Sequence, residues 1–109
     1  MKIWVDDVRP APEGYVWCKS TNRAKKEIIL SEYNLERCAS NLRDFWKIEL
    51  IDLDHDAGQY EQYGGDYIRI LDWLEETGRD YPIRIHSMNP VGRENMRRII
   101  ERNGWKEIR

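Results

Sequence analysis

The chain has 109 residues, a formal net charge of −2, 35% charged residues and a mean hydropathy of −0.82. This length supports one domain over residues 1–109 with its own core, and it is too short for two. No apolar run approaches the roughly 20 residues of a membrane span, so a membrane protein is excluded and a cytoplasmic location is expected. Cys18 and Cys38 stand apart without a CxxC pair, so we expect reduced thiols, not a disulfide framework or a zinc site.

Two short strands are predicted at the start of the chain, at Lys2–Val5 and at Tyr15–Cys18. The segment between them, 8–14, contains two prolines and a glycine, which break helices, so it is expected to be a loop. Ser20 or Thr21 is suited to cap a helix that follows the second strand.

The middle of the chain is less regular. Glu32–Trp46 has apolar residues at helical spacing but mixed propensities, which leaves its structure open. Lys47–Leu53 is predicted to be a strand that leads into a polar loop. Asp66 is predicted to cap an amphipathic helix, which Gly78 closes.

The last third has the clearest local signals. The alternation at Ile83–Ile85 predicts a strand, and Asn89 followed by a proline matches a helix N-cap with Pro in the first turn. The helix is predicted over Pro90–Asn103 with a stop at Gly104, and a final strand is expected near Trp105–Ile108.

Strands that alternate with helices favour an α/β domain with a mainly parallel central sheet. The carboxyl ends of such strands meet along one edge, and ligands bind at that edge in open sheets. Three predicted strands end there in polar residues with functional chemistry, namely Asp6, Asp7, Asp54, His55, Asp56, His86 and Ser87.

The carboxylates at these strand ends suggest a divalent cation. Adjacent carboxylates such as Asp6 and Asp7 repel unless a positive charge neutralises them, although an Asp pair can also simply form a turn. Oxygen-rich clusters suit Mg²⁺, Mn²⁺ or Ca²⁺. A calcium EF-hand loop starting at Asp52 is excluded, because it would need glycine at Ala57 and glutamate at Tyr63. The DxD pattern at Asp52 and Asp54 is also found in phosphatases of the haloacid-dehalogenase type, but these enzymes need a larger core than this chain can supply.

The two histidines of the chain, His55 and His86, both lie at predicted strand ends, where they are a candidate acid/base pair or ordinary structural residues. The helix after Asn89 offers backbone N–H groups that can bind a phosphate. Arg93, in its first turn, gains nothing from the helix dipole and is either an anion ligand or an exposed arginine.

A longer pattern covers three segments: DDVRPAPEG at 6–14, LDHDAG at 53–58 and IHSMNPVGRENM at 85–96. Together they resemble the cyclic-phosphate-processing receiver-like family, a diverged branch of the response-regulator receiver domains. The resemblance implies a single receiver-like domain with a flavodoxin-like three-layer sandwich and about five strands, without the final receiver helix. It also implies processing of a cyclic nucleotide or an RNA-end cyclic phosphate.

The resemblance assigns roles to individual residues. Asp6 and Asp7 match the acidic metal-binding pair, and Asp54 matches the position that receivers phosphorylate. His55 and His86 match histidines that ordinary receivers lack, and Ser87 matches a phosphate-contacting hydroxyl. Together with the residue-based arguments, the resemblance gives three sets of candidate residues. The candidate metal ligands are Asp6, Asp7, Asp54 and Asp56. The candidate catalytic residues are His55, His86 and Asp54, and the candidate phosphate-binding residues are Ser87, Asn89, Arg93 and Arg9.

Three residues depart from the family pattern, and these departures bear on which function is expected. Asp52 stands where the family has a small hydroxyl residue, Ala57 replaces a larger aliphatic residue, and Lys106 comes too early for the receiver lysine. A phosphoacceptor signalling receiver is therefore the less favoured alternative.

The favoured hypothesis is a phosphoesterase that uses Mg²⁺ or Mn²⁺ on a cyclic nucleotide or a 2′,3′-cyclic RNA end. The other alternative is a non-catalytic module that binds a nucleotide or phosphate ligand. Duplex DNA binding is not expected, since the net charge is slightly negative. The sequence leaves open whether Asp54 acts as a nucleophile and what the oligomeric state is.

Overall fold

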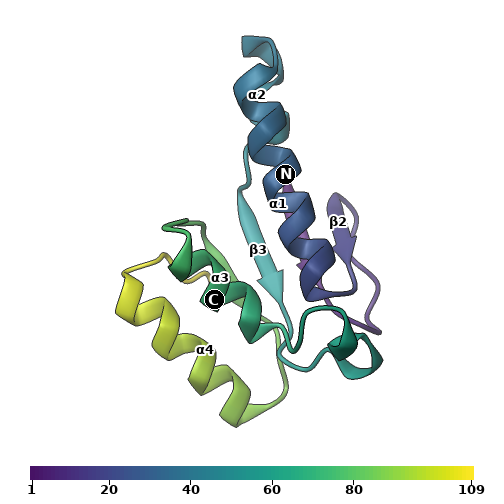
Figure 1. The fold of residues 1–109 in the computed structure, drawn as a ribbon, viewed down its shortest axis with the longest axis vertical. Helices are drawn as coiled ribbons and strands as arrows, with labels where there is room; N and C mark the ends of the chain where they lie inside the picture. The colour runs from purple at the N-terminus through teal and green to yellow at the C-terminus, as the bar shows by residue number, and fades with distance from the viewer.

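The computed structural model describes residues 1–109 and has a parallel four-stranded sheet at its centre, in the order β2-β1-β3-β4. The strands are β1 (Lys2–Val5), β2 (Tyr15–Cys18), β3 (Leu50–Leu53) and β4 (Ile83–Ile85) (Figure 1). They are short and rich in the β-branched and aromatic residues that favour extended backbone. Since all pairs are parallel, the four carboxyl ends meet along one edge of the sheet.

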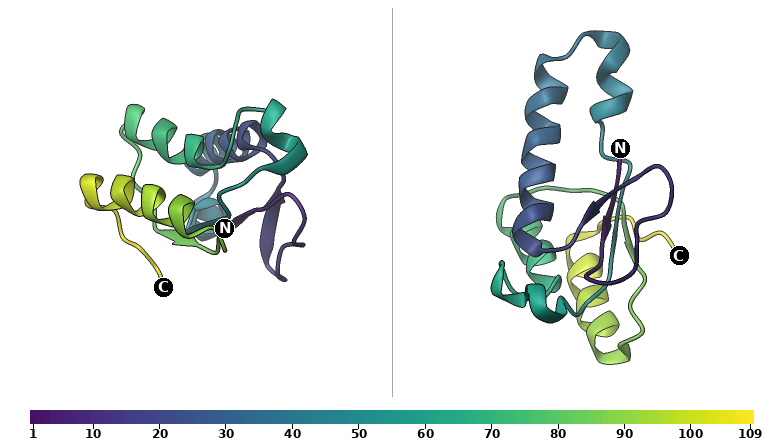
Figure 2. Two further views of the ribbon diagram at one scale, coloured as in Figure 1. Left: turned by 90° about the horizontal axis from the view of Figure 1, so that it is seen from below. Right: turned by 90° about the vertical axis from the view of Figure 1, so that its right-hand side faces the viewer.

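Four α-helices and two 3₁₀ turns lie between the strands and after the last one: α1 (Thr21–Arg37), η1 (Ser40–Leu42), α2 (Arg43–Trp46), η2 (Gly58–Gln62), α3 (Ile68–Glu76) and α4 (Pro90–Asn103). The hydroxyl of Ser20 accepts a hydrogen bond from the Arg23 amide, which confirms the expected cap of α1. The region that the sequence left open, Glu32–Trp46, forms the last six residues of α1, then η1 and α2. These elements project as a hairpin beyond the sheet (Figures 1 and 2).

One face of the sheet packs on the helices and forms the core. Alternate strand residues point to this face, among them Ile3 and Val5 of β1 and Ile51 and Leu53 of β3, and all four are fully buried. The helices meet them with one apolar stripe each, made of Ala24, Ile28, Ile70, Leu71, Leu74, Met96, Ile99 and Ile100. Each long helix thereby contributes one apolar stripe to a single core, while Ile29 and Leu30 of α1 stay exposed.

The other face of the sheet carries no helix. Its central row runs across the strands from Trp17 through Trp4 and Asp52 to Arg84, according to the strand register. The flavodoxin-like α/β fold is confirmed, but the second helical layer of a three-layer sandwich is absent from residues 1–109. A loop joins β1 to β2 where a crossover helix would lie, and no helix follows α4. Figure 2 shows α1, α3 and α4 on one side of the strands.

The element bounds confirm most of the predicted order and correct three details. α4 spans Pro90–Asn103 as predicted and ends at Gly104, whose φ of 68° is left-handed. The predicted cap at Asp66 is wrong, because that carboxylate accepts the Ala57 amide while Tyr67 precedes α3. β3 starts at Leu50, not Lys47, and the expected fifth strand is a single parallel bridge between Ile83 and Glu107. No helix has the length and apolarity to cross a membrane.

Candidate functional site

The three polar strand ends predicted from the sequence converge at the carboxyl edge of the sheet. The Asp54 amide donates to the Val5 carbonyl, 2.9 Å away, and the His86 amide donates to the Leu53 carbonyl, 3.0 Å away. These bonds continue the strand ladders for one residue beyond β3 and β4, and the Asp6 amide, which donates to the Cys18 carbonyl at 3.3 Å, does the same beyond β1. The side chains that leave the three strands are thereby held next to each other by the backbone.

His86 lies between two buried carboxylates. Its Nε2 is 2.9 Å from Oδ2 of Asp6, and its Nδ1 is 2.7 Å from Oδ1 of Asp52. Both carboxylate side chains have 0% exposure and the imidazole has 7%. The contact brings together the ends of β1 and β4 with the middle of β3, so the histidine fixes the positions of both acids.

Two residues of the helix-free face complete the surroundings of His86. The indole of Trp4 stacks on the imidazole, with ring centroids 3.9 Å apart and planes at 5°. Arg84 binds the second oxygen of Asp52 at 3.1 Å. Asp52, Trp4 and Arg84 were not among the predicted site residues. The available signal was an acid in the apolar segment LIDL, which implies a buried partner.

The hydrogen bonds of His86 limit its chemistry in this geometry. Ionised carboxylates only accept, so a bond to each requires a proton on both ring nitrogens, or a proton on one carboxyl group. The two bonds leave no free ring nitrogen to take a proton from a substrate. In this arrangement, His86 acts as a donor or, if the bond to Asp6 opens, as a ligand through Nε2.

Asp6, Asp54 and His86 form the one group of potential metal ligands in the structure, with donor atoms that lie within 4.8 Å of one another. Burial raises the pKa of Asp6, but the amides of Arg9 and Val8 and then His86 outweigh it, so its pKa is lowered. Burial together with the charges of Asp6 and Asp54 raises the pKa of Asp7. Negative charge is therefore concentrated here and only partly neutralised by the protein.

His55 is oriented from one side only. Its Nδ1 is 2.9 Å from Oδ1 of Asp56, and its Nε2 has no hydrogen-bond partner. The bond to His55 is the main reason that the pKa of Asp56 is lowered. The ring lies against Gly92 of α4, where a β-carbon would overlap it. An imidazole with one nitrogen held by a carboxylate and the other free has the usual form of a proton-transfer residue.

The predicted phosphate-binding residues lie around the start of α4 and in the loop after β1. Asn89 caps α4 by accepting the Gly92 amide, and the buried Ser87 hydroxyl accepts the Asn89 amide, so these groups are partly occupied. The Arg93 and Arg9 side chains are exposed, and Nη1 of Arg9 lies 3.5 Å from the His86 carbonyl. Neither arginine forms a salt bridge within the protein.

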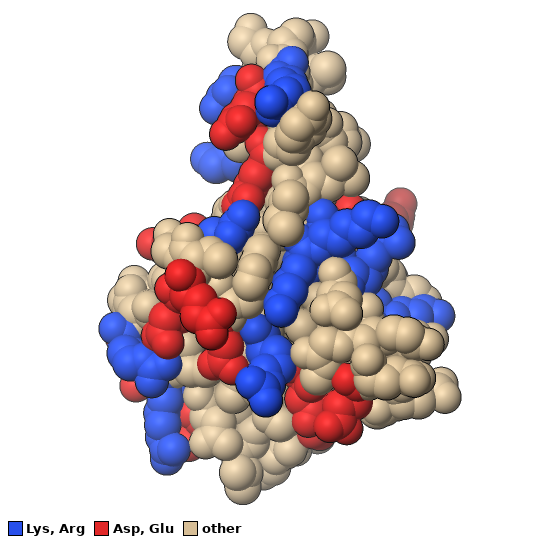
Figure 3. Space-filling view, viewed as in Figure 1, with Lys and Arg blue, Asp and Glu red and all other residues tan.

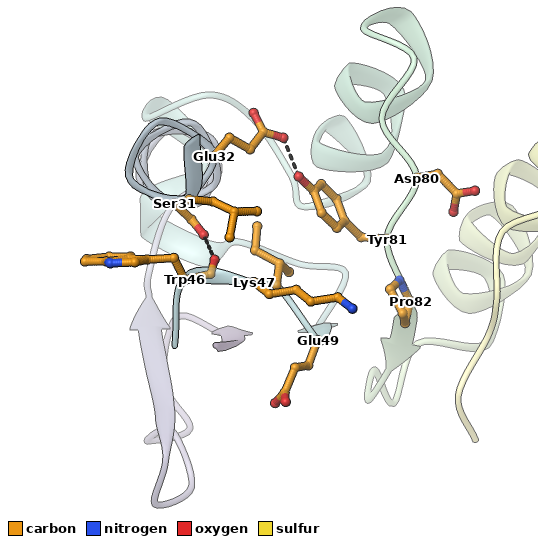
Figure 4. A pocket seen from close by; sticks show the side chains of 10 residues that line it. Ser31, Glu32, Trp46, Lys47, Glu49, Asp80, Tyr81 and Pro82 are labelled. Atoms are coloured by element: carbon orange, nitrogen blue, oxygen red, sulfur yellow. Dashed lines mark hydrogen bonds between the residues drawn. The ribbon is translucent and has the colours of Figure 1, made fainter. Parts of the chain in front are cut away.

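A cavity at the opposite end of the sheet has a different character. It measures about 520 Å³ and lies before β3 and β4, with Glu32 and Tyr81 on its wall (Figure 4). Glu32 accepts hydrogen bonds from Nε and Nη2 of Arg79, at 2.9 and 2.8 Å, and from the Tyr81 hydroxyl. The charge of this carboxylate is satisfied within the protein.

On the face that bears the helices, acidic and basic side chains are intermixed (Figure 3). This face has no continuous basic surface of the kind that follows the phosphates of a duplex.

The comparisons with known proteins give one family match. The family model described as "Cyclic-phosphate processing Receiver domain" matches residues 1–102, which is nearly the whole chain. Searches among curated proteins and among solved structures each found no match.

Proposed function

The chain belongs to the cyclic-phosphate processing receiver domain family, and from this premise we propose that it is a metal-dependent phosphoesterase that opens a cyclic phosphate. The observation that carries the proposal is the group of Asp6, Asp54 and His86 at the carboxyl edge, with His55 and its free Nε2 beside it. A group of potential metal ligands that includes Asp54, an acid without a salt bridge, and an oriented imidazole are parts that phosphate ester hydrolysis requires.

The residues at the edge suit a divalent cation. Asp6 and Asp54 offer carboxylate oxygens, and a cation would relieve the repulsion that Asp7 experiences from both. Two carboxylates favour Mg²⁺ or Mn²⁺, and a nitrogen ligand from His86 would shift the preference toward Mn²⁺. Asp56, already bonded to His55 and Asn89, would serve as a ligand only at the cost of those bonds. Such a cation would polarise the phosphoryl group and lower the pKa of a bound water.

We assign proton transfer first to His55. Asp56 holds its Nδ1, so that Nε2 is free to take a proton from the attacking water or give one to the leaving ribose oxygen. Rotation of the ring is restricted by Gly92, against which it packs. His86 stays a predicted second proton-transfer residue, but its two carboxylate bonds support a positioning role for Asp6.

The phosphate oxygens would lie between the cation ligands and the start of α4. Arg93 and Arg9 supply mobile positive charge there, and Ser87 and Asn89 hold the loop that leads into α4. Charge on the phosphoryl oxygens increases in the transition state, so these arginines would stabilise it more than the ground state. Asp54 is available as a ligand or as a nucleophile.

Phosphorus NMR tests the proposal directly. The protein is incubated with Mg²⁺ or Mn²⁺ and a 2′,3′-cyclic mononucleotide, a short RNA with a 2′,3′-cyclic end, or a cyclic dinucleotide. We expect one of them to be converted to a monoester or a linear diester, and His55→Ala to abolish the conversion. Tight binding without conversion would instead identify a binding module. Absence of both binding and conversion would contradict the proposal.

A further inference from the structure

A second pocket adjoins the acidic edge on the side of β2. It measures about 400 Å³ and is lined by Trp17, Lys19, Ser20, Arg23, Tyr60 and Tyr63. These residues come from the end of β2, the first turn of α1 and the turn η2 with the residue after it. We call this group the basic-aromatic pocket, because three aromatic rings and two cations make up nearly all of its lining.

The basic-aromatic pocket is joined to the candidate active site by direct contacts. The indole Nε1 of Trp17 donates to the Asp6 carbonyl at 2.8 Å. On the other side, Gly58 at the start of η2 lies so close to the Asp7 carboxylate that a β-carbon would overlap it. Asp6 and Asp7 therefore form the border between the two sites. A molecule with its phosphate at the acidic edge could extend into this pocket.

We propose that the basic-aromatic pocket binds the nucleoside of a nucleotide whose cyclic phosphate lies at the acidic edge. This inference rests on the proposed function and specifies its substrate as a nucleotide, as opposed to a simple cyclic phosphodiester. The shared chemistry is a base and ribose attached to the phosphate. Both a free cyclic mononucleotide and the last nucleotide of an RNA chain contain it.

The aromatic rings are available for stacking. The Tyr63 side chain is 50% exposed, and its ring centroid is 6.2 Å from that of Tyr60 with the planes tilted by 46°. Neither tyrosine hydroxyl has a hydrogen-bond partner within the protein, so both can contact the polar edge of a base. Every base presents a π-face, and stacking of this kind tolerates different bases.

The cations explain why an anionic ligand would be attracted beside an acidic site. Lys19 forms no ion pair, and its Nζ lies 4.5 Å from the centre of the Trp17 ring. Arg23 pairs with Glu27 at 2.9 Å but is 56% exposed and able to turn toward a ligand. These two charges offset the repulsion that the acidic edge exerts on a nucleotide.

The test compares substrates with and without a base. The ratio of kcat/KM is measured for adenosine 2′,3′-cyclic phosphate and for methyl riboside 2′,3′-cyclic phosphate, in wild type and in Tyr63→Ala. Tyr33→Ala is the matched control, because Tyr33 is 53% exposed on α1 and far from the edge in the fold. We expect Tyr63→Ala to reduce the preference for the nucleoside substrate roughly tenfold, which corresponds to the loss of one stacking contact, and Tyr33→Ala to preserve it.

A binding measurement separates this inference from the proposed function. Quenching of tryptophan fluorescence by adenosine 3′-monophosphate, compared with inorganic phosphate, needs no turnover. Quenching that weakens in both Tyr63→Ala and Lys19→Ala supports the pocket even if no cyclic phosphate is hydrolysed. Turnover with equal kcat/KM for the two substrates overturns the pocket and leaves the activity intact. If a cyclic-ended trinucleotide is preferred over the mononucleotide, the source is an RNA end.

Discussion

Glu32 and Asp7, which lie at the two ends of the sheet, are in opposite electrostatic situations. At the amino end, burial raises the pKa of Glu32, but hydrogen bonds from Arg79 and Tyr81 outweigh it and lower the pKa. At the carboxyl edge, burial and two neighbouring acids raise the pKa of Asp7, and neither Asp7 nor Asp54 pairs with a lysine or arginine. The charge at the first end is satisfied within the protein, whereas the second end is where we propose that a cation binds. Unbalanced charge, and not cavity size, distinguishes a binding site from a structural ion pair.

The largest effect on stability is expected from substitution of His86, which bonds to two buried acids at the carboxyl edge. His86→Ala removes the group that bonds to both Asp6 and Asp52 and leaves two fully buried acids without it. We expect the free energy of unfolding to fall by about 3–5 kcal/mol, because breaking a buried ion pair leaves uncompensated charge. Urea unfolding measures this loss.

His55→Ala is the matched control for that substitution. Its partner Asp56 has a side-chain exposure of 61%, so the loss should stay within about 1 kcal/mol. Equal losses in the two variants would show that His86 does not stabilise the edge in the way described.

Glu32→Gln tests the amino end of the sheet, where the charge of the carboxylate is satisfied within the protein. The substitution replaces a charged acceptor of three hydrogen bonds, so we expect a loss of about 1.5–3 kcal/mol in the free energy of unfolding. Because the pKa of Glu32 is lowered from its ordinary value of 4.5, this stabilisation is present above that pH. It disappears as the pH falls through the folded-state pKa. A difference between variant and wild type that stays constant down to pH 3 would contradict the assignment.

Asp7→Asn is expected to have the smallest effect, of opposite sign. The raised pKa of Asp7 means that its ionised form destabilises the fold, so stability falls as the pH rises above the ordinary value of 3.8. Removing the charge should raise the free energy of unfolding by about 0.5–1 kcal/mol at neutral pH. Thermal unfolding in the absence of metal measures the change, and a loss similar to that of Glu32→Gln would erase the contrast between the two ends.

Features that depend on residues close together in the chain, such as the ends of helices and strands, could be predicted from the sequence. Asn89 and Gly104 bound α4 because a cap and a left-handed turn are local features, and the strand ends follow from short apolar segments that stop at acids. The roles of Trp4 and Asp52 depend on cross-strand register, which brings them next to each other only in the folded sheet. The same limit applies to Asp66, whose carboxylate bonds to Ala57 nine residues earlier instead of to the next helix. The loop at 8–14 and the absence of a final helix were both expected, but the resemblance still implied a three-layer sandwich, so the bare second face was not foreseen.

The most direct test of the account compares turnover in two variants that each neutralise one acid. Asp54→Asn changes the carboxyl edge and Glu32→Gln changes the amino end. Conversion of a 2′,3′-cyclic mononucleotide in the presence of Mn²⁺ is followed by phosphorus NMR. At temperatures below its thermal unfolding transition, we expect Glu32→Gln to convert the substrate at the wild-type rate. Asp54→Asn should stay folded and lose conversion by at least about 100-fold, the scale of a lost group in the catalytic site. Conversion by Asp54→Asn at the wild-type rate, or no conversion by the wild type, would contradict the central claim.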